Sequence, residues 1–129
     1  MDTLKLEIVT PKGIIFKGDV KSITLPGSEG EFGVLPGHAS VLTLLKTGVI
    51  DIENTNAKHD LVAIDGGYAE VDESGVNILA EGAVYVGGDE SESKIADSLK
   101  KVEDLLDSIK SDPYVTENVL ARVKSIRKS

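Results

Sequence analysis

The sequence predicts an α+β chain, with an N-terminal antiparallel β-sandwich followed by a C-terminal antiparallel two-helix hairpin. Apolar residues recur with a period of two up to about residue 86, and with the period of a helix after about residue 91. Between the two patterns, Gly87 and Gly88 interrupt both. We therefore expect a β-sandwich domain at residues 1–86 and a helical hairpin domain at residues 87–129, with a hinge near residues 87–90.

The β half consists of short apolar runs separated by turn sequences. Leucine and isoleucine alternate with polar residues at 4–8, and Gly, Pro, Asn and Asp cluster between the runs. Further runs follow at residues 20–25, 49–53, 61–64, 68–71, 76–80 and 83–86. This spacing is typical of an antiparallel sandwich or barrel. A parallel α/β sheet needs helical crossovers of about a dozen residues, and we expect none before residue 87.

The helical half consists of two amphipathic segments. Ser91 and Asp89 are candidate N-caps of the first, and Asp112 with Pro113 predicts the start of the second. The first apolar stripe steps by four and three residues through Ile95, Leu99, Val102, Leu106 and Ile109, and the second contains Val115, Val119, Val123 and Ile126. Isolated helices of this length are marginally stable in water. We therefore expect the hairpin to pack against the sandwich or a partner.

The net charge and its distribution along the chain limit the kinds of partner that the chain can bind. The 129-residue chain has a net charge of −8, which argues against binding to nucleic acid, because phosphate contacts need a basic surface. Residues 113–129 are the exception, because they contain four basic side chains and one acidic one. The basic side chains are Arg122, Lys124, Arg127 and Lys128. They form either a solvated helix face or a contact for an acidic partner surface.

The most unusual segment is the run PGSEGEFGVLPGH at residues 26–38. Its four glycines suggest turns with positive φ or close backbone contacts in a loop. Its glycine spacing matches neither phosphate-binding fingerprint, and Glu29 and Glu31 would repel a phosphate. Two interpretations remain open for this loop: a structural turn between two strands, or a surface that contacts a partner.

A catalytic interpretation rests on His38 at the end of the same loop. His38 with Glu29 or Glu31 could act in a small enzyme as a general base, but no nucleophile or substrate pocket can be identified. The two histidines lack the spacing of a zinc site, and the chain contains no cysteine. We therefore expect no catalytic, cofactor-binding or metal-binding residues.

Three segments together resemble the epsilon subunit of the F-type ATP synthase: GSEGEFGVLPGHA at 27–39, LKTGVI at 45–50 and IDGGY at 64–68. The resemblance extends over nearly the whole chain. It implies a non-catalytic subunit of the rotating central stalk, which couples rotation of the c-ring to catalysis in the F1 head. It further implies that the helical hairpin inhibits ATP hydrolysis. The implied partners are the gamma subunit, the c-ring and the alpha and beta subunits.

The resemblance also implies a location and site residues. The location is peripheral, at the cytoplasmic face of the bacterial inner membrane, with membrane association only through the complex. Glu31, with Glu29 beside it, matches the position near the polar loop of the c subunits, and His38 lies where the sandwich approaches the stalk. The basic residues of the last helix are candidates for the acidic stretch of the beta subunit.

The sequence departs from this family's pattern at the motif that binds ATP. Some bacterial members bind ATP at the hairpin through an Ile/Leu-Asp-x-x-Arg-Ala motif. The matching segment here is SKIADSLKK at 93–101, which has no Arg-Ala pair, so we expect no ATP at this position. The alternative to an ATP synthase subunit is a generic adaptor whose hairpin binds an unrelated partner.

Overall fold

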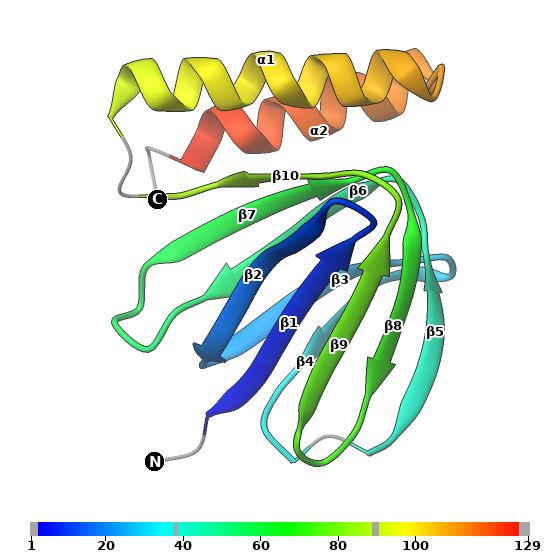
Figure 1. Ribbon diagram of the computed structural model, residues 1–129, viewed down its shortest axis with the longest axis vertical. Coiled ribbons are helices and arrows are strands. Elements are labelled where there is room, and N and C mark those ends of the chain that lie inside the picture. Colours follow the sequence, from blue (N-terminus) through cyan, green and yellow to red (C-terminus); the bar gives the residue numbers. More distant parts are fainter. Residues whose placement is uncertain (1–2, 38, 89–90, 127–129) are drawn as a thin grey trace.

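A computed structural model describes residues 3–37, 39–88 and 91–126 of the chain, and Figure 1 shows its strands below a pair of helices. The strands are β1 (Leu4–Thr10), β2 (Gly13–Val20), β3 (Ser22–Gly27), β4 (Gly30–Val34), β5 (Val41–Leu45), β6 (Gly48–Glu53), β7 (His59–Ile64), β8 (Gly67–Val71), β9 (Gly75–Ala80) and β10 (Ala83–Val86). The helices are α1 (Glu92–Ser108) and α2 (Pro113–Ser125). The predicted α+β fold, with strands first and a helical hairpin last, is confirmed.

The strands form one continuous sheet that folds over on itself. Its order is β10-β7-β6-β3-β5-β8-β9-β1-β2, and β4 pairs with β3 outside this path. Neighbours are antiparallel except for β1 and β9, which are parallel. The two end strands, β10 and β2, come close to each other: Phe16 on β2 stacks on Tyr85 on β10, with ring centroids 6.1 Å apart. The sheet therefore encloses a core on its inner side.

That inner core, here called the main core, is built by the predicted alternation of apolar residues. On β1, Leu4, Leu6 and Ile8 are buried while the residues between them are exposed or half-buried. Strands β1 to β9 each contribute a buried side chain, which for β2, β4 and β5 is the last residue of the strand, and β10 contributes by partial burial. Other large members are Ile23, Leu25, Ile50, Ile52, Ile64 and Ile78. All members of the main core precede the hairpin in sequence.

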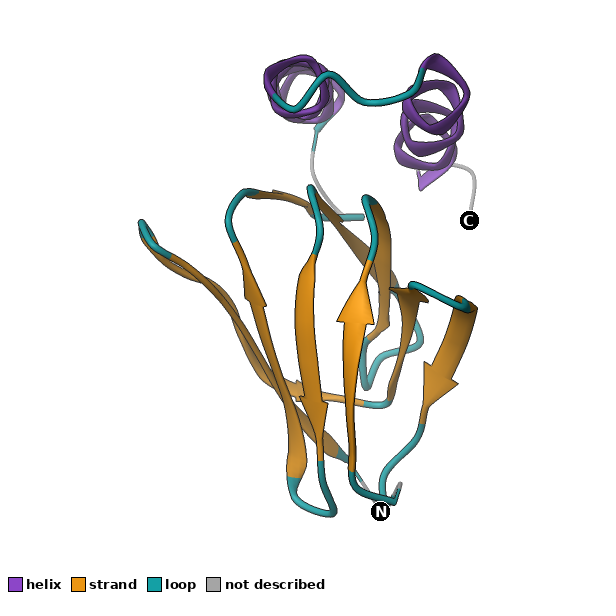
Figure 2. Cartoon of the chain, turned by 90° about the vertical axis from the view of Figure 1, so that its right-hand side faces the viewer, coloured by secondary structure: helices purple, strands orange, loops and turns teal. Residues whose placement is uncertain are grey.

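A second core lies between the outer side of the sheet and the helices, and is here called the hairpin core. The sheet contributes Val49, Leu61, Ala63 and Val86, and the helices contribute Ile95, Val102, Leu106, Val119, Val123 and Ile126. Figure 2 shows the helices as a separate layer on one side of the sandwich. Strand β7 is thus covered on both faces, which explains its unbroken apolar run at residues 61–64.

Local sequence determines where each helix begins. The Ser91 hydroxyl accepts a hydrogen bond from the Lys94 backbone N–H, which confirms Ser91 as the N-cap of α1. The Asp112 carboxylate accepts from the Tyr114 N–H at 2.8 Å, and Pro113 follows it at the first position of α2, as predicted. The other candidate cap, Asp89, lies outside the described residues.

Residues 26–38 are not one loop, which corrects the sequence-based expectation. Residues 30–34 form β4, which pairs with β3 as a tight hairpin. Gly30 has a φ of +128° at the end of the turn, and a Cβ at Gly27 would lie 2.8 Å from the Gly30 carbonyl oxygen. Positive φ and close backbone approach therefore account for these two glycines, and the structural-turn interpretation describes this part of the run.

Candidate functional site

Two of the residues predicted to bind partners, Glu31 and Arg122, meet where α2 crosses the sandwich. Arg122 on α2 directs Nη1 to Glu31 Oε2 on β4 at 2.5 Å, and Nη2 to Asp51 Oδ2 on β6 at 3.7 Å. Glu31 and Arg122 are 91 residues apart in sequence. Two residues for which the sequence predicted separate partners thus contact each other. Their partner contacts stay predictions.

The same carboxylate of Asp51 extends the network to a fourth element. Asp51 Oδ1 lies 2.6 Å from His59 Nδ1 on β7. Glu31, Asp51, His59 and Arg122 are here called the ion-pair cluster. All four side chains are partly exposed, from 28% for Asp51 to 51% for Glu31. The cluster therefore lies at the rim of the hairpin core, within reach of solvent.

An open groove lies beside this cluster, between one edge of α2 and the sandwich. It has a volume of about 670 Å³, and Lys46, Asn118 and Arg122 are among the residues that line it. The apolar contacts of α2 are thus flanked by water-accessible space on the side where Arg122 lies.

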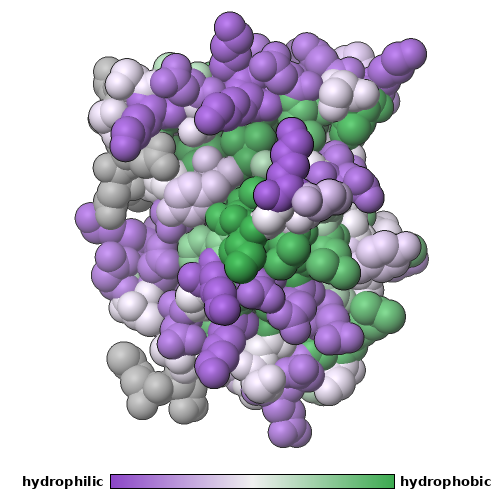
Figure 3. Space-filling view, in the orientation of Figure 1, coloured by the Kyte–Doolittle hydropathy of each residue, from purple (hydrophilic) through white to green (hydrophobic). Residues whose placement is uncertain are grey.

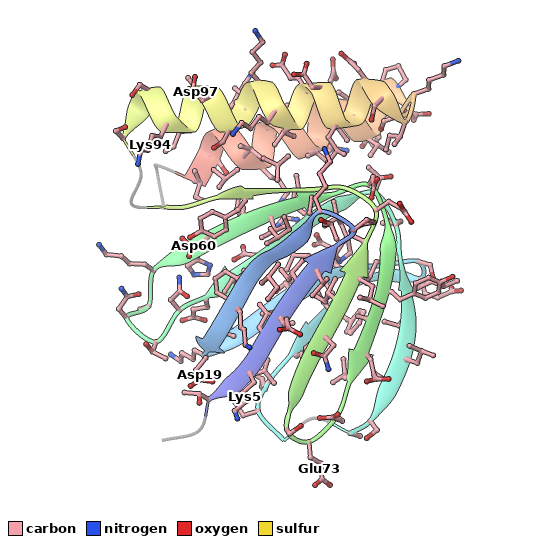
Figure 4. The ribbon with its side chains drawn as sticks, viewed as in Figure 1. Lys5, Asp19, Asp60, Glu73, Lys94 and Asp97 are labelled. Atoms are coloured by element: carbon pink, nitrogen blue, oxygen red, sulfur yellow. The ribbon has the colours of Figure 1, made fainter. Side chains whose placement is uncertain are left out.

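A second polar contact fastens the connection between the two halves. Asp60 Oδ1 accepts a hydrogen bond from the Gly88 backbone N–H at 2.9 Å, and Oδ2 accepts from Tyr85 at 2.8 Å and from Asn54 at 2.9 Å. Figure 4 shows Asp60 below the connection that leads from β10 to α1. A Cβ at Gly88 would collide with the carbonyl oxygen of His59. Asp60 therefore holds the end of the sandwich against the start of the predicted hinge.

The outer face of β5, β8 and β9 carries exposed apolar side chains. Leu44 lies opposite Tyr68, and Tyr68 lies opposite Leu79 in the sheet register. With Leu42 on the same side of β5, they form what is here called the apolar face, and each is at least 54% exposed. Neighbouring exposed apolar residues of this kind mark interaction surfaces. By contrast, Figure 3 shows a mostly hydrophilic surface on the visible outer side of the helices.

Two other predicted site residues, Glu29 and Lys124, are not part of the ion-pair cluster. Glu29 is exposed in the β3–β4 turn, and Lys124 is exposed on α2. His38, Arg127 and Lys128 lie outside the described residues, so the enzyme alternative with His38 has no described geometry. Asp97 is exposed on α1, and Figure 4 shows it on the side of the helix away from the sandwich.

Within residues 3–37, 39–88 and 91–126, no three His, Asp or Glu side chains are grouped so that they could hold a metal ion. Across the same residues, neither helix is long and apolar enough to cross a membrane.

Comparison with known proteins places this architecture in a family. The model of the family described as "ATP synthase, Delta/Epsilon chain, beta-sandwich domain" matches residues 3–86. An ATP synthase epsilon chain of Campylobacter curvus is 55% identical over 126 residues, covering 98% of this chain and 97% of the relative. The chain belongs to the ATP synthase epsilon chain family. The resemblance found in the sequence is thereby confirmed, and as an epsilon chain the protein is a non-catalytic subunit of ATP synthase.

Another epsilon chain and two solved structures are also similar to this chain. The epsilon chain of Wolinella succinogenes is 49% identical over 129 residues, covering all of this chain and 98% of the relative. A chain in the structure of the Euglena gracilis mitochondrial ATP synthase, which comprises OSCP, F1 and the c-ring, matches with a TM-score of 0.63 and 26% identity. That match covers 99% of this chain and 81% of the other. A chain of the Tetrahymena thermophila central stalk and c-ring shares the fold, with a TM-score of 0.52, 16% identity and coverage of 84% and 96%.

The sequence predicted Glu31 and Arg122 as site residues, but none of the polar contacts between the hairpin and the sandwich. Asp51, His59 and Asp60 were not among the predicted site residues. A signal was present: Asp51 and Glu53 lie in the second half of β6, and His59 and Asp60 begin β7, so these polar residues gather at one end of the strand pair. Because β6 and β7 are covered by the main core on one face and by the hairpin on the other, charged residues at the end of this strand pair lie at the rim of the hairpin.

Proposed function

We propose that this epsilon chain is a central-stalk subunit of a bacterial F-type ATP synthase, which couples c-ring rotation to catalysis in F1. In this proposal the C-terminal helices inhibit ATP hydrolysis by leaving the sandwich and extending toward the alpha and beta subunits. The subunit works at the cytoplasmic face of the inner membrane and is held there through the complex. The division into residues 1–86 and 87–129 is part of the same proposal.

The observation that carries this proposal is the separation of the two cores. Among the residues that the structure describes, the main core contains none of α1 or α2, and the hairpin core contributes none to the interior of the sandwich. The hairpin can therefore leave without opening the main core, at the cost of exposing Val49, Leu61, Ala63 and Val86. A subunit that regulates through movable helices needs this arrangement, because its sandwich must stay folded and bound while the helices move.

The apolar face supports a permanent contact with the gamma subunit. It lies on β5, β8 and β9, whereas the hairpin covers β6, β7 and β10. Both contacts can therefore exist together. Burying exposed leucine and tyrosine side chains at the centre of an interface is the usual source of binding free energy, so this face would hold the sandwich on the stalk in both hairpin states.

Capture of a gamma–c-ring complex by the tagged chain tests this assignment. We expect the wild-type chain to retain the complex, and Leu44→Asp to reduce its retention at least tenfold by placing a carboxylate inside the interface. Asp97→Ala, on the outer side of α1, serves as the matched control and is expected to retain the complex. A wild-type chain that fails to bind would refute the assignment, and full retention by Leu44→Asp would refute the role of the apolar face.

A further inference from the structure

The hairpin core contains little that fixes where α2 rests. Its contribution from this part of the chain is a stripe of Val119 and Val123 on α2 and Ile126 at the C-cap, against valine, leucine and alanine on the sheet. Apolar burial of this kind is strong but non-directional. A specific resting position needs directional contacts, and in the described residues the ion pairs between α2 and the sheet are those of Arg122.

Arg122 has the geometry for this role. It lies one residue before the buried Val123, so the guanidinium group leaves α2 at the edge of the apolar stripe. Its two terminal nitrogens face carboxylates on different strands, Glu31 on β4 and Asp51 on β6. A planar guanidinium can serve two acceptors at once, whereas a lysine ammonium is a single point charge. One side chain therefore ties α2 to two strands.

The sheet side of the cluster is held in place by its own contacts. Asp51 Oδ1 is engaged by His59 Nδ1 across the β6–β7 pair, which leaves Oδ2 directed to Arg122. Glu31 is on a strand that pairs with β3 in regular register. The carboxylates thus form a fixed acceptor pair, and the part that moves is the helix with Arg122.

We propose that the ion-pair cluster of Glu31, Asp51, His59 and Arg122 is an electrostatic latch that controls release of the hairpin from the sandwich. Because its side chains are partly exposed beside an open groove, salt screens the latch and anions compete for Arg122. The main core keeps the sandwich folded, while the latch, together with the hairpin core, sets the fraction of molecules with α2 docked. The latch would regulate the hairpin movement of the proposed function, but it acts within the isolated chain.

The absence of cysteine from the sequence allows a direct test. Val49 and Ile50 are adjacent on β6, with Val49 covered by the hairpin and Ile50 facing the main core. A single cysteine introduced as Val49→Cys is exposed to a thiol reagent when the hairpin leaves. The same cysteine introduced as Ile50→Cys is exposed only when the sandwich opens. Labelling rates of the full-length isolated chain therefore separate undocking from unfolding.

In the Val49→Cys background, Arg122→Ala is expected to raise the labelling rate about fivefold at low salt, the effect of a rim ion-pair network. Arg122→Lys is expected to fall between wild type and Arg122→Ala, and Lys124→Ala, on the same helix, to match wild type. In 1 M NaCl the difference between wild type and Arg122→Ala should disappear. In the Ile50→Cys background none of these variants should change the rate.

Equal Val49→Cys rates for Arg122→Ala and Lys124→Ala at low salt would overturn the latch. So would a difference that persists in 1 M NaCl, or an Ile50→Cys rate that rises in parallel. If Arg122→Ala does not fold, Glu31→Gln makes the same test from the sheet side. No partner subunit takes part, so failure of the latch is distinguishable from failure of the proposed function.

Discussion

Replacing Leu106 with alanine tests whether the hairpin core and the main core are energetically separate. Leu106 lies on α1, is 1% exposed and belongs to the hairpin core. Truncating a buried leucine costs about 3 kcal/mol through lost burial and the cavity left behind. If that cost falls on hairpin docking alone, the equilibrium between docked and undocked hairpins shifts about a hundredfold, while the free energy of unfolding of the sandwich stays unchanged.

Hydrogen exchange measured separately for α1 and β1 provides the assay. We expect the protection of α1 amides to fall by about two orders of magnitude in Leu106→Ala, while β1 amides keep their wild-type protection. Leu79→Ala is the matched control, because Leu79 is 57% exposed on the apolar face and its truncation should leave both segments unchanged. Equal loss of protection in α1 and β1 would mean that the two cores unfold as one unit, and the reasoning would fail.

Further predictions concern the hinge and a surface turn. Asp60→Ala leaves three hydrogen-bond donors without their acceptor, so it should lower the free energy of unfolding by about 2 kcal/mol. The control Asp97→Ala should change the free energy of unfolding by less than about 0.5 kcal/mol. Equal effects of the two variants in denaturant titration would contradict the hinge contact of Asp60. Gly88→Ala should speed labelling in the Val49→Cys background, because the added Cβ collides with the carbonyl oxygen of His59 on the sandwich. An unchanged labelling rate would contradict this close contact. The Ser74 hydroxyl, followed by backbone N–H groups, lowers the pKa of Asp72. Its stabilisation is therefore present above the unfolded-state pKa and lost as pH falls through the lower folded-state pKa, so NMR should give an Asp72 midpoint below that of an unfolded aspartate.

The architecture could be predicted because local patterns determine most of it. Neighbouring residues predict the apolar stripe of α1, the Ser91 cap and the Asp112-Pro113 start. The structure confirms the two helix starts and the stripe from Ile95 to Leu106. Ile109 was wrongly predicted to continue the stripe, because it follows the last residue of α1 and is 37% exposed. Strand β5 was missed for a physical reason. Its residues Val41, Leu42 and Leu44 are apolar but exposed, so they do not produce the alternation of a half-buried strand.

The polar contacts between the two halves could not be predicted, because they depend on how the hairpin docks. Glu31 and Arg122 come together only after β4 is paired, both helices are formed and α2 is laid across β6. The parallel pairing of β1 with β9 is a similar long-range feature. Family resemblance supplied the class of protein, but it assigned Glu31 and Arg122 to different partners and gave no indication that they meet.

The rate of ATP hydrolysis by the assembled enzyme tests the central claim most directly. Complexes containing the full-length chain would be compared with complexes containing residues 1–86, which hold the whole main core. If the hairpin inhibits, complexes with residues 1–86 should hydrolyse ATP several-fold faster while containing as much of the subunit. An equal rate at equal subunit content would show that the hairpin does not regulate hydrolysis.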